Sequence, residues 1–506
     1  MIYNTIKSNA YFDSVTLMLF SSHLNAIEGV EEAAVMMGTD HNKELMFDSG
    51  LLTSDLLSKI TSNDLVIGIK AGSQAVIDEA LKVLNDQFEN KSKPSGNQEV
   101  VIRSVDAAIK HDPGLNFAVV SIPGRFAKSE VMKCLRHQMH VLLFSDNVSL
   151  ADENELKDYA VDHGLLMMGP DCGTAIINGV ALGFANVVRR GGIGLVAASG
   201  TGAQEVSVLI DKLGGGVSHV LGTGGRDIKD SVGGKMMLMG LEALAADPQT
   251  RVIGIVSKPP YPSVLKKVLA KLATIDKPIA ACFLGEDPAA FEGTKVSGCE
   301  TLEALSAKLV ELEQGSAPTL APLPKLQAMS LDGHYIRGLY TGGTLAYEAL
   351  LLLQKEVGGV YANIAIDDQY LLKDVETSQQ HTILDMGEDY FTDGMPHPMI
   401  DPRLRSERIK KEVADPDTAV ILLDCVLGYG SHPDPAGALV SAIENARSAY
   451  PHRKVHFVAS VCGTDLDPQN GVQQREKLVA AGVHVLPTNA QAARLAAWLL
   501  KTGVRS

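Results

Sequence analysis

The chain has 506 residues, a formal net charge of −15, 45% hydrophobic and 5% aromatic residues, and 47 glycines. This length is too great for one core and predicts two to four domains, and the aliphatic, glycine-rich composition predicts an α/β protein. The negative charge argues against a nucleic-acid or membrane partner, but it leaves room for a local positive pocket that binds a small anionic substrate.

The cysteines and the N-terminus indicate a cytoplasmic protein. The six cysteines lie far apart with no C-x-x-C pair, which favours reduced thiols over disulfides or a zinc site, so we expect no metal. Asp13 interrupts the apolar run of the N-terminal stretch, so we expect no signal peptide, and no uncharged apolar run is long enough to span a bilayer.

Two polar segments rich in Ser, Pro and Gly are typical of linkers. They are "ENKSKPSGNQEV" (Glu89 to Val100) and "EQGSAPTLAPLPK" (Glu313 to Lys325). With the changes of pattern along the chain, they predict four domains, at residues 1–98, 99–190, 191–313 and 327–506.

Residues 1–98 alternate apolar runs with helical patterns, from "YFDSVTLMLFSSHLNAI" to "QAVIDEALKVLNDQF". This pattern predicts a small α+β domain with the element order βαββαβ. It contains no catalytic signature, and we assign it no chemistry.

Residues 99–190 show unbroken apolar strands between amphipathic helices, as in "NFAVVSIP", "HVLLFSD" and "LLMMGPD". This pattern predicts a parallel sheet covered on both faces, in which ligands bind beyond the carboxyl ends of the strands. The polar residues at those ends are the candidate substrate- or CoA-binding residues Asp146, Asn147, Pro170 and Asp171. Ordinary turns and helix caps are the alternative interpretation.

The last two domains contain four matched landmarks in the same order. "GLVAASGTGAQEV" matches "GLYTGGTLAYEAL", "VLGTGGRDI" matches "ILDMGEDYF", "ADPQTRVIGIVSKPP" matches "ADPDTAVILLDCVLG", and "KPIAACFLG" matches "KVHFVASVCG". We infer a duplicated flavodoxin-like unit, with a first repeat at residues 191–313 and a second repeat at 327–506. An insertion around "DDQYLLKDVETSQQ" and "TDGMPHPMIDPRLRSERI" widens the second repeat.

Each repeat opens with a glycine-rich turn from a strand into a helix. Such a turn leaves the first helical amides unpaired and favours an anion, and neighbouring hydroxyls add hydrogen bonds. Two such helix starts facing each other predict one phosphate pocket, although a simple helix cap is the alternative use of a Gly-Thr pair. The candidate phosphate-binding residues are Ser199, Gly200, Thr201, Gly202, Thr341, Gly342, Gly343 and Thr344.

These turns, together with "MGPDCGTAI", resemble the ligase-type units of succinyl-CoA synthetase from about Asn116 to the C-terminus. Over the whole chain, "FDSVTLM", "LLFSDNVSL", "LLMMGPDCGTAIINGV", "LGTGGRD", "SKPP" and "GMPHPMIDP" resemble the FdrA family of acyl-CoA-synthetase-like proteins. The resemblance implies a Rossmann-like CoA-binding domain followed by two flavodoxin-like domains, fused as counterparts of the synthetase α subunit and the end of its β subunit.

Two departures from the synthetase pattern bear on mechanism. The stretch "FLGEDPAAFEGTKVSGCETL", where a synthetase of this type carries its phosphorylated histidine, has no histidine. The chain also has no ATP-grasp domain, so we expect no ATP site; CoA binding stays open, since no glycine-rich first half precedes Asn116.

The resemblance implies acyl or carbamoyl transfer to or from phosphate, with phosphate or an acyl or carbamoyl phosphate as ligand. FdrA-like proteins are associated with carbamoyl transfer in nitrogen catabolism, which implies oxalurate plus phosphate as substrates and other subunits as partners in an oligomer. Two alternatives stay open: an ATP-dependent acid–CoA ligase that needs a separate ATP-grasp chain, and a non-catalytic anion-binding scaffold.

Further candidates follow from chemistry at strand ends and in loops. His397 is the acid–base candidate, and Arg226 and Asp227 would hold a carboxylate and orient a donor. Lys258 would add positive charge near the first turn. Lesser candidates are Asp401 and Arg403 as braces of the His397 loop, His432 as a second histidine, and Cys172, for which we expect no nucleophilic role.

Overall fold

The computed structural model describes residues 1–8, 10, 12, 14–90, 102–324, 326–393 and 395–505. The chain divides into two compact units, residues 1–103 with 393–396 and residues 104–392 with 397–506. Of the two predicted linkers, residues 91–100 and Lys325 lie outside the described residues.

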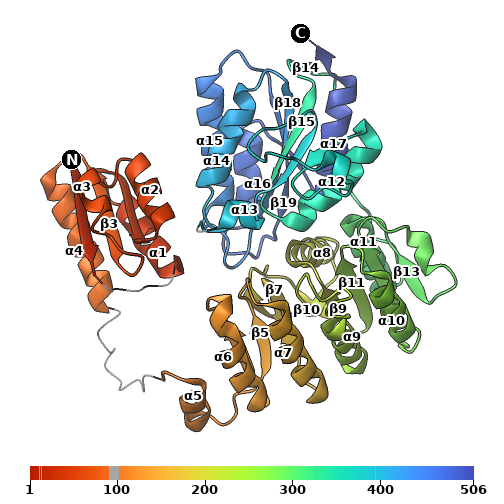
Figure 1. The fold of residues 1–506 in the computed structure, drawn as a ribbon. Coiled ribbons are helices and arrows are strands. Elements are labelled where there is room, and N and C mark those ends of the chain that lie inside the picture. Colours follow the sequence, from red (N-terminus) through yellow and green to blue (C-terminus); the bar gives the residue numbers. More distant parts are fainter. Residues whose placement is uncertain are drawn as a thin grey trace. The chain divides into compact units, whose positions relative to one another are not determined.

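The first unit is a three-stranded antiparallel sheet in the order β1-β3-β2, covered by helices (Figure 1). Alternation along β2 sends Ala33 and Val35 toward α1 and α4, and Ala34 toward α2 on the other face. The elements are β1 (Ile2–Lys7), α1 (Ser14–Asn25), β2 (Val30–Met37), α2 (Asp40–Asp48), α3 (Ser54–Leu57), β3 (Leu65–Ala71) and α4 (Gln74–Asn90).

The described elements of this unit follow the order βαβααβα, which corrects the predicted βαββαβ. After β2 the chain enters α2 instead of a paired strand. Thr39 begins that helix, and its hydroxyl oxygen accepts a hydrogen bond from the amide of Asn42 (3.3 Å). The helix cap at Thr39 therefore explains why a helix follows β2, which the apolar pattern alone did not predict.

The second unit begins with a small parallel sheet in the order β4-β5-β6. Its elements are α5 (Val105–His111), β4 (Phe117–Val120), α6 (Gly124–Arg136), β5 (His140–Leu143), α7 (Leu150–Asp162) and β6 (Met167–Met168). An antiparallel hairpin of β7 (Thr174–Ile177) and β8 (Val180–Gly183) then joins the next sheet, because β7 pairs with β10.

The first repeat forms a seven-stranded sheet in the order β13-β12-β11-β9-β10-β7-β8. Its parallel strands have the flavodoxin order 2-1-3-4-5 when counted from β9. The elements are β9 (Arg190–Ala197), α8 (Gly200–Lys212), β10 (Val217–Gly222), α9 (Lys235–Ala246), β11 (Val252–Ser257), α10 (Pro262–Leu272), β12 (Ile279–Phe283), the 3-10 turn η1 (Pro288–Phe291), β13 (Val296–Gly298) and α11 (Leu302–Gln314).

The second repeat forms a six-stranded parallel sheet in the order β16-β17-β15-β18-β19-β20, which is again 2-1-3-4-5 apart from β16. A short pair, β14 (Ser330–Leu331) with β21 (Val504–Arg505), flanks it. The elements are β15 (Tyr335–Tyr340), α12 (Gly343–Val357), β16 (Tyr361–Ala362), the 3-10 turn η2 (Asp368–Tyr370), β17 (Thr382–Asp385), α13 (Asp389–Thr392), α14 (Arg403–Ala414), β18 (Thr418–Val426), α15 (Pro435–Ala449), β19 (His456–Cys462), α16 (Gly471–Ala480), β20 (His484–Leu486) and α17 (Asn489–Thr502).

The two repeats pack together through equivalent helices. Side chains of α8 and α11 from the first repeat and of α12 and α17 from the second share one apolar core. The predicted α/β class with parallel sheets is confirmed. Residues 403–409 are not part of an insertion, because α14 occupies the place in the second repeat that α9 occupies in the first.

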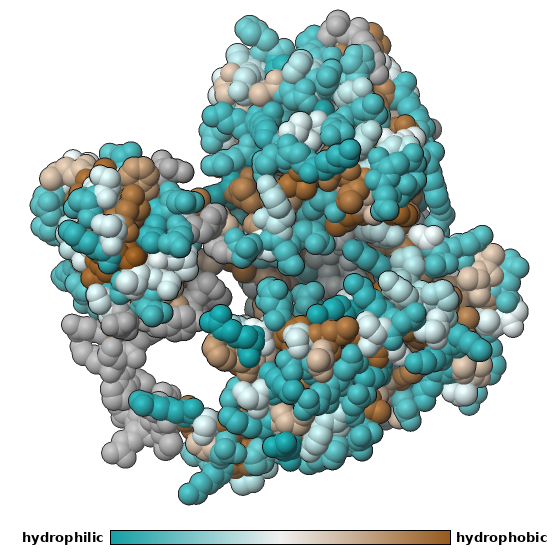
Figure 2. Space-filling view, in the orientation of Figure 1, coloured by the Kyte–Doolittle hydropathy of each residue, from teal (hydrophilic) through white to brown (hydrophobic). Residues whose placement is uncertain are grey.

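Hydrophilic residues cover most of the face in Figure 2, with hydrophobic residues in smaller groups between them. None of the helices in the described part of the chain is both long enough and apolar enough to cross a bilayer.

Candidate functional site

The start of α8 is a turn with unused amide groups. The hydroxyl oxygen of Ser199 accepts a hydrogen bond from the amide of Gly202 (3.0 Å). Among the described residues, the amides of Gly200 and Thr201 have no acceptor, and Gly200 is exposed. The helix-cap interpretation therefore holds for Ser199, while two amides at the positive end of the helix stay available to an anion.

The start of α12 differs because a carboxylate of the chain occupies it. The amide of Thr341 donates to both oxygens of Asp424 (2.9 and 3.0 Å), and the amide of Gly342 donates to Oδ2 (2.8 Å). Arg405 donates to Oδ1 of the same carboxylate (2.6 Å). This arrangement corrects the phosphate role predicted for Thr341 and Gly342, since Asp424 already satisfies their amides.

The two helix starts touch each other, as the duplication suggested. The hydroxyl oxygens of Ser199 and Thr344 lie 2.6 Å apart, and the amide of Thr344 donates to Oγ1 of Thr201 (3.3 Å). Gly342 allows this approach, because a Cβ atom there would lie 2.9 Å from Cγ2 of Thr201. The predicted hydroxyl ligands on α8 and α12 thus bond to one another across the interface between the two repeats, which we call the seam. This leaves the α8 amides and the amide of Gly343 as donors to an anion.

A buried carboxyl group, Asp385, lies at the same helix start. Its Oδ1 accepts a hydrogen bond from the amide of Gly387 (2.9 Å), and a Cβ atom on Gly343 would collide with its Oδ2. Burial, followed by repulsion from Glu388, raises the pKa of Asp385 to about 7. At neutral pH this group is therefore divided between its acid and its carboxylate form.

His397 packs beside Asp385 as a neutral ring. Its Nδ1 accepts a hydrogen bond from the amide of Met399 (3.2 Å), so the ring proton sits on Nε2, and a Cβ atom at Gly387 would lie 2.6 Å from that Nε2. Burial lowers the pKa of His397 to about 4. A ring that is neutral at pH 7 has a hydrogen bond to donate through Nε2 but no cationic proton to give, which argues against the predicted acid–base role.

Arg226 and Asp227 follow β10 and belong to an ion-pair network with side chains of α7. Asp227 is fully buried, and its carboxylate accepts from Nζ of Lys157 (2.9 Å) and from the amide of Met237 (2.8 Å). The Nε atom of Arg226 lies 2.8 Å from Oε2 of Glu153. We therefore correct Asp227 from a substrate contact to a structural residue, whereas Arg226 keeps a partly exposed guanidinium group.

The candidate CoA-binding residues lie at the ends of β5 and β6. Asn147 and Asp171 both have positive φ angles (51° and 54°), and a cis bond joins Gly169 to Pro170. The side chain of Asp171 is solvent-accessible, yet surrounding protein atoms desolvate its carboxyl group. This desolvation, with repulsion from Asp146, raises the pKa of Asp171 to about 6.

Lys258 follows β11 and faces the second repeat. Its Nζ lies 5.1 Å from the ring centre of Tyr347 on α12, and its positive charge opposes the upward shift in the pKa of Asp385. The predicted positive charge is thus present at the seam, close enough to act on the buried acid.

The lesser candidates have local partners. Asp401 and Arg403 form an ion pair (2.6 Å). Nδ1 of His432 accepts from the amide of Asp434 (3.0 Å). Cys172 is buried, and burial raises the pKa of its thiol to about 12, which leaves no thiolate for nucleophilic attack.

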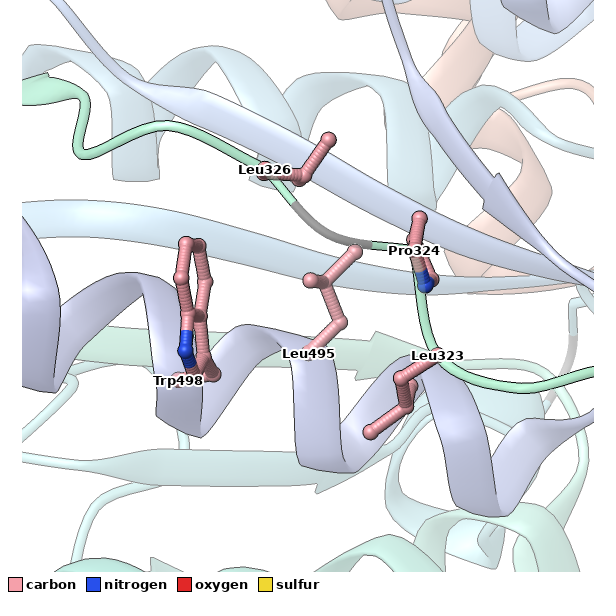
Figure 3. Close-up of a pocket in the computed structure, with 5 residues that line it drawn as sticks. All are labelled: Leu323, Pro324, Leu326, Leu495 and Trp498. Atoms are coloured by element: carbon pink, nitrogen blue, oxygen red, sulfur yellow. The ribbon is translucent and has the colours of Figure 1, made fainter.

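One cavity lies away from these groups. It measures about 350 Å³ and is lined by Leu323, Pro324 and Leu326 on one side and by Leu495 and Trp498 of α17 on the other (Figure 3). The described side chains that line it carry no acidic or basic group, so we place the chemistry at the helix starts.

The sequence alone missed three site residues, Asp385, Asp424 and Arg405. The repeat alignment contained the signal for two of them. Asp424 stands where the first repeat has Val256, and Asp385 stands where it has Gly222. A charge that replaces a small or apolar residue at a buried strand end points to function or to a specific ion pair.

Two family models match parts of the chain. Residues 339–499 match the model described as CoA-ligase, and residues 1–102 match the model described as AllF, heavy metal-associated domain. The chain therefore carries a CoA-ligase domain and an AllF-type N-terminal domain.

Known proteins are similar to this chain over different shares of its length. It is 45% identical over 491 residues to the uncharacterized protein YahF of Escherichia coli, with 94% of each chain covered. It is 26% identical to the alpha subunit of the ADP-forming succinate–CoA ligase of Methanothermobacter thermautotrophicus, covering 30% of this chain and 51%, about half, of that subunit. The solved structure of PH0766 from Pyrococcus horikoshii OT3 aligns at 17% identity and a TM-score of 0.35, covering 79% of this chain and 86% of that one.

The N-terminal domain does not fit the metal in its model's name. Residues 1–102 contain no cysteine and only His23 and His41 as histidines. In the part of the chain that the structure describes, no group of three or more His, Cys, Asp or Glu side chains could hold a metal ion. We therefore derive no metal chemistry from this domain.

Proposed function

Because this chain belongs to the same family as the Escherichia coli protein YahF and carries a CoA-ligase domain, we propose that it is an acyl-CoA-synthetase-like enzyme component. In this proposal it transfers an acyl or carbamoyl group to or from phosphate. The finer form is the FdrA-type reaction, in which oxalurate and phosphate give carbamoyl phosphate and oxamate.

The start of α8 is the observation that carries the proposal. The free amides of Gly200 and Thr201 would hold phosphate oxygens, with the amide of Gly343 across the seam and the charge of Lys258 nearby. Fixed amide dipoles of this kind stabilise the negative charge that develops on the tetrahedral intermediate of acyl transfer. They would also hold phosphate and the acyl carbon in line for attack.

The strand ends of the small parallel sheet are the proposed second half of the site. Asp146, Asn147, Pro170 and Asp171 would contact the acyl group or a CoA-like carrier, beyond the carboxyl ends of β5 and β6. Arg226, whose guanidinium is partly exposed, would hold a substrate carboxylate. We propose that other subunits complete the enzyme.

An acid–CoA ligase with ATP bound by a separate chain is a second candidate. The match of residues 339–499 to the CoA-ligase model favours it. The absence of histidine from the stretch between Phe283 and Leu302 counts against it, because a phosphohistidine relay would need that side chain.

Two reaction mixtures separate these candidates. The purified chain, alone and with partner subunits, is incubated with oxalurate and phosphate, and then with acyl-CoA, ADP and phosphate. Carbamoyl phosphate in the first mixture supports transfer, and ATP in the second supports the ligase. If neither mixture gives a product while the protein still binds phosphate, the result supports a non-catalytic anion-binding scaffold.

A matched pair of variants tests the phosphate site itself. Gly200→Pro removes one amide donor at the first helical position, where proline is compatible with the helix and Ser199 has the extended backbone that proline requires before it. Gly200→Ala keeps the donor and has space, since the nearest atom to its Cβ would be 3.4 Å away. Loss of a hydrogen bond to a charged group weakens binding about 10- to 100-fold. We expect phosphate to protect the wild type and the alanine variant against heat unfolding, and equal protection of the proline variant would refute the site.

A further inference from the structure

The two repeats differ in a row of residues near the carboxyl ends of their central strands. In the first repeat, neighbouring strands β10, β9, β11 and β12 align Gly222, Ala197, Val256 and Cys282. In the second repeat, the equivalent strands β17, β15, β18 and β19 align Asp385, Tyr340, Asp424 and Ser460. The row that is small and apolar in one copy is thus polar throughout in the other, at the edge of the sheet where ligands bind.

Three members of this polar row are enclosed by the protein. Asp424 is committed to the α12 amides and to Arg405. The hydroxyl of Tyr340 and the Oγ atom of Ser460 are buried and have no hydrogen-bond partner in the described part of the chain. Asp424 therefore has its carboxylate paired within the protein, and the two hydroxyl groups are shielded from solvent.

Asp385 is also buried, but its two oxygens are used differently. One of its oxygens is held by the amide of Gly387, and the other packs against the backbone of Gly343, where a side chain would not fit. Among the described residues, the backbone amide of Gly387 is the donor to this carboxyl group and it bonds to Oδ1, which leaves Oδ2 at the helix start without a donor.

The groups that face Asp385 come from five segments. Lys258 follows β11, Asp424 lies near the end of β18, Glu388 follows β17, and the neutral ring of His397 packs on Gly387. Tyr340 is its neighbour in register on β15. Burial and the negative charges of Glu388 and Asp424 outweigh the positive charge of Lys258. They raise the pKa of Asp385 to about 7.

We infer that Asp385 is the catalytic acid–base residue of the proposed phosphate site. This inference rests on the proposed function and adds the group that moves the proton. A phosphate oxygen bonds to the acyl carbon while the bond from that carbon to the leaving nitrogen or sulfur breaks. The leaving atom takes one proton from Asp385, and the attacking hydrogen phosphate returns one to it, so the carboxyl group ends in its starting form.

Sulfate is the probe for this proton, because it mimics phosphate and does not titrate between pH 6 and 9. Protonated Asp385 tolerates an anion beside it and ionised Asp385 repels it. We therefore expect the apparent dissociation constant of sulfate, from heat-unfolding shifts of the full chain, to rise about tenfold per pH unit above 7. The Gly200→Pro variant measures the general stabilising effect of sulfate, which is subtracted.

The isosteric Asp385→Asn variant decides the result. It stays neutral and keeps an oxygen for the amide of Gly387, so its sulfate affinity should be independent of pH, while His397→Gln should keep the wild-type profile. In any active mixture Asp385→Asn should lower kcat by about 10²- to 10⁴-fold with sulfate binding retained.

An Asp385→Asn variant with the wild-type pH profile, or with unchanged kcat, overturns the inference and leaves the phosphate site standing. A different result would refute the phosphate site itself. If sulfate protects the wild type no more than it protects Gly200→Pro, there is no phosphate site, and the acid–base role of Asp385 is refuted with it.

Discussion

A substitution of Glu348 tests the packing between the two repeats, because its carboxyl group is buried at the seam. Its Oε1 accepts from the amide of Leu302 at the start of α11, and its Oε2 accepts from Nδ2 of Asn489 (both 2.8 Å). In the equivalent position of the first repeat, Glu205 accepts from the amide of Asn489 at the start of α17 (3.1 Å). Each repeat thus caps the last helix of the other.

The magnitude follows from burial, which raises the pKa of Glu348 from 4.5 to about 7 despite those hydrogen bonds. The folded protein keeps this proton to higher pH than the unfolded chain does. The stabilising contribution is therefore complete below pH 4.5 and is lost as the pH rises to 7. A shift of about 2.5 units corresponds to about 3 kcal/mol of unfolding free energy.

The Glu348→Gln variant cannot ionise and should not lose this contribution. Urea unfolding at pH 5 and pH 8 gives the free energy of unfolding of the variant relative to the wild type. That difference should move by about 2.5 kcal/mol in favour of the variant at pH 8, because part of the contribution is already lost at pH 5. Glu356→Gln, an exposed change on the same helix, is the control and should show the same difference at both pH values. A Glu348→Gln difference that is also constant would refute the reasoning.

Three further outcomes are expected. Gly342→Ala forces a Cβ atom to 2.9 Å from Cγ2 of Thr201 and should lower the free energy of urea unfolding by about 1–3 kcal/mol. The same variant should lose its protection by phosphate against heat unfolding, and full protection would show that the helix starts need not touch. Asp424→Val gives the second repeat the residue of the first but leaves Arg405 buried without its carboxylate, so it should cost about 3–5 kcal/mol in the same assay, and a loss below about 1 kcal/mol would contradict the ion pair. All six cysteines are buried, and burial raises the pKa of Cys172 to about 12, so a thiol reagent should label the native protein only as fast as it unfolds; rapid labelling would contradict the burial.

The fold could be predicted from sequence because its signals are local and repeated. Unbroken apolar runs such as "IGLVA" between amphipathic helices require a parallel sheet covered on both faces. Four landmarks in the same order then indicate two copies of one unit, and both sheets have the same strand order. The N-terminal unit carried weaker signals, and a single threonine cap redirected its chain.

The site was less predictable because its geometry depends on distant partners. Asp227 looked like a turn residue open to a ligand, but Lys157, seventy positions earlier, buries it. Thr341 looked like an anion donor, but Asp424, more than eighty positions later, already occupies its amide. Turn motifs reveal which amides are unpaired within a helix, and they do not reveal which side chain arrives from elsewhere to pair them.

The exchange of helix caps between Glu205 and Glu348 has a consequence for the chain's architecture. Two separate polypeptides joined by such reciprocal contacts would come apart on dilution. A covalent tether makes their encounter intramolecular and fixes a high effective concentration at any protein level. Fusion therefore secures a complete seam in every molecule, and cutting the connection between residues 315 and 324 should make assembly depend on how much protein is present.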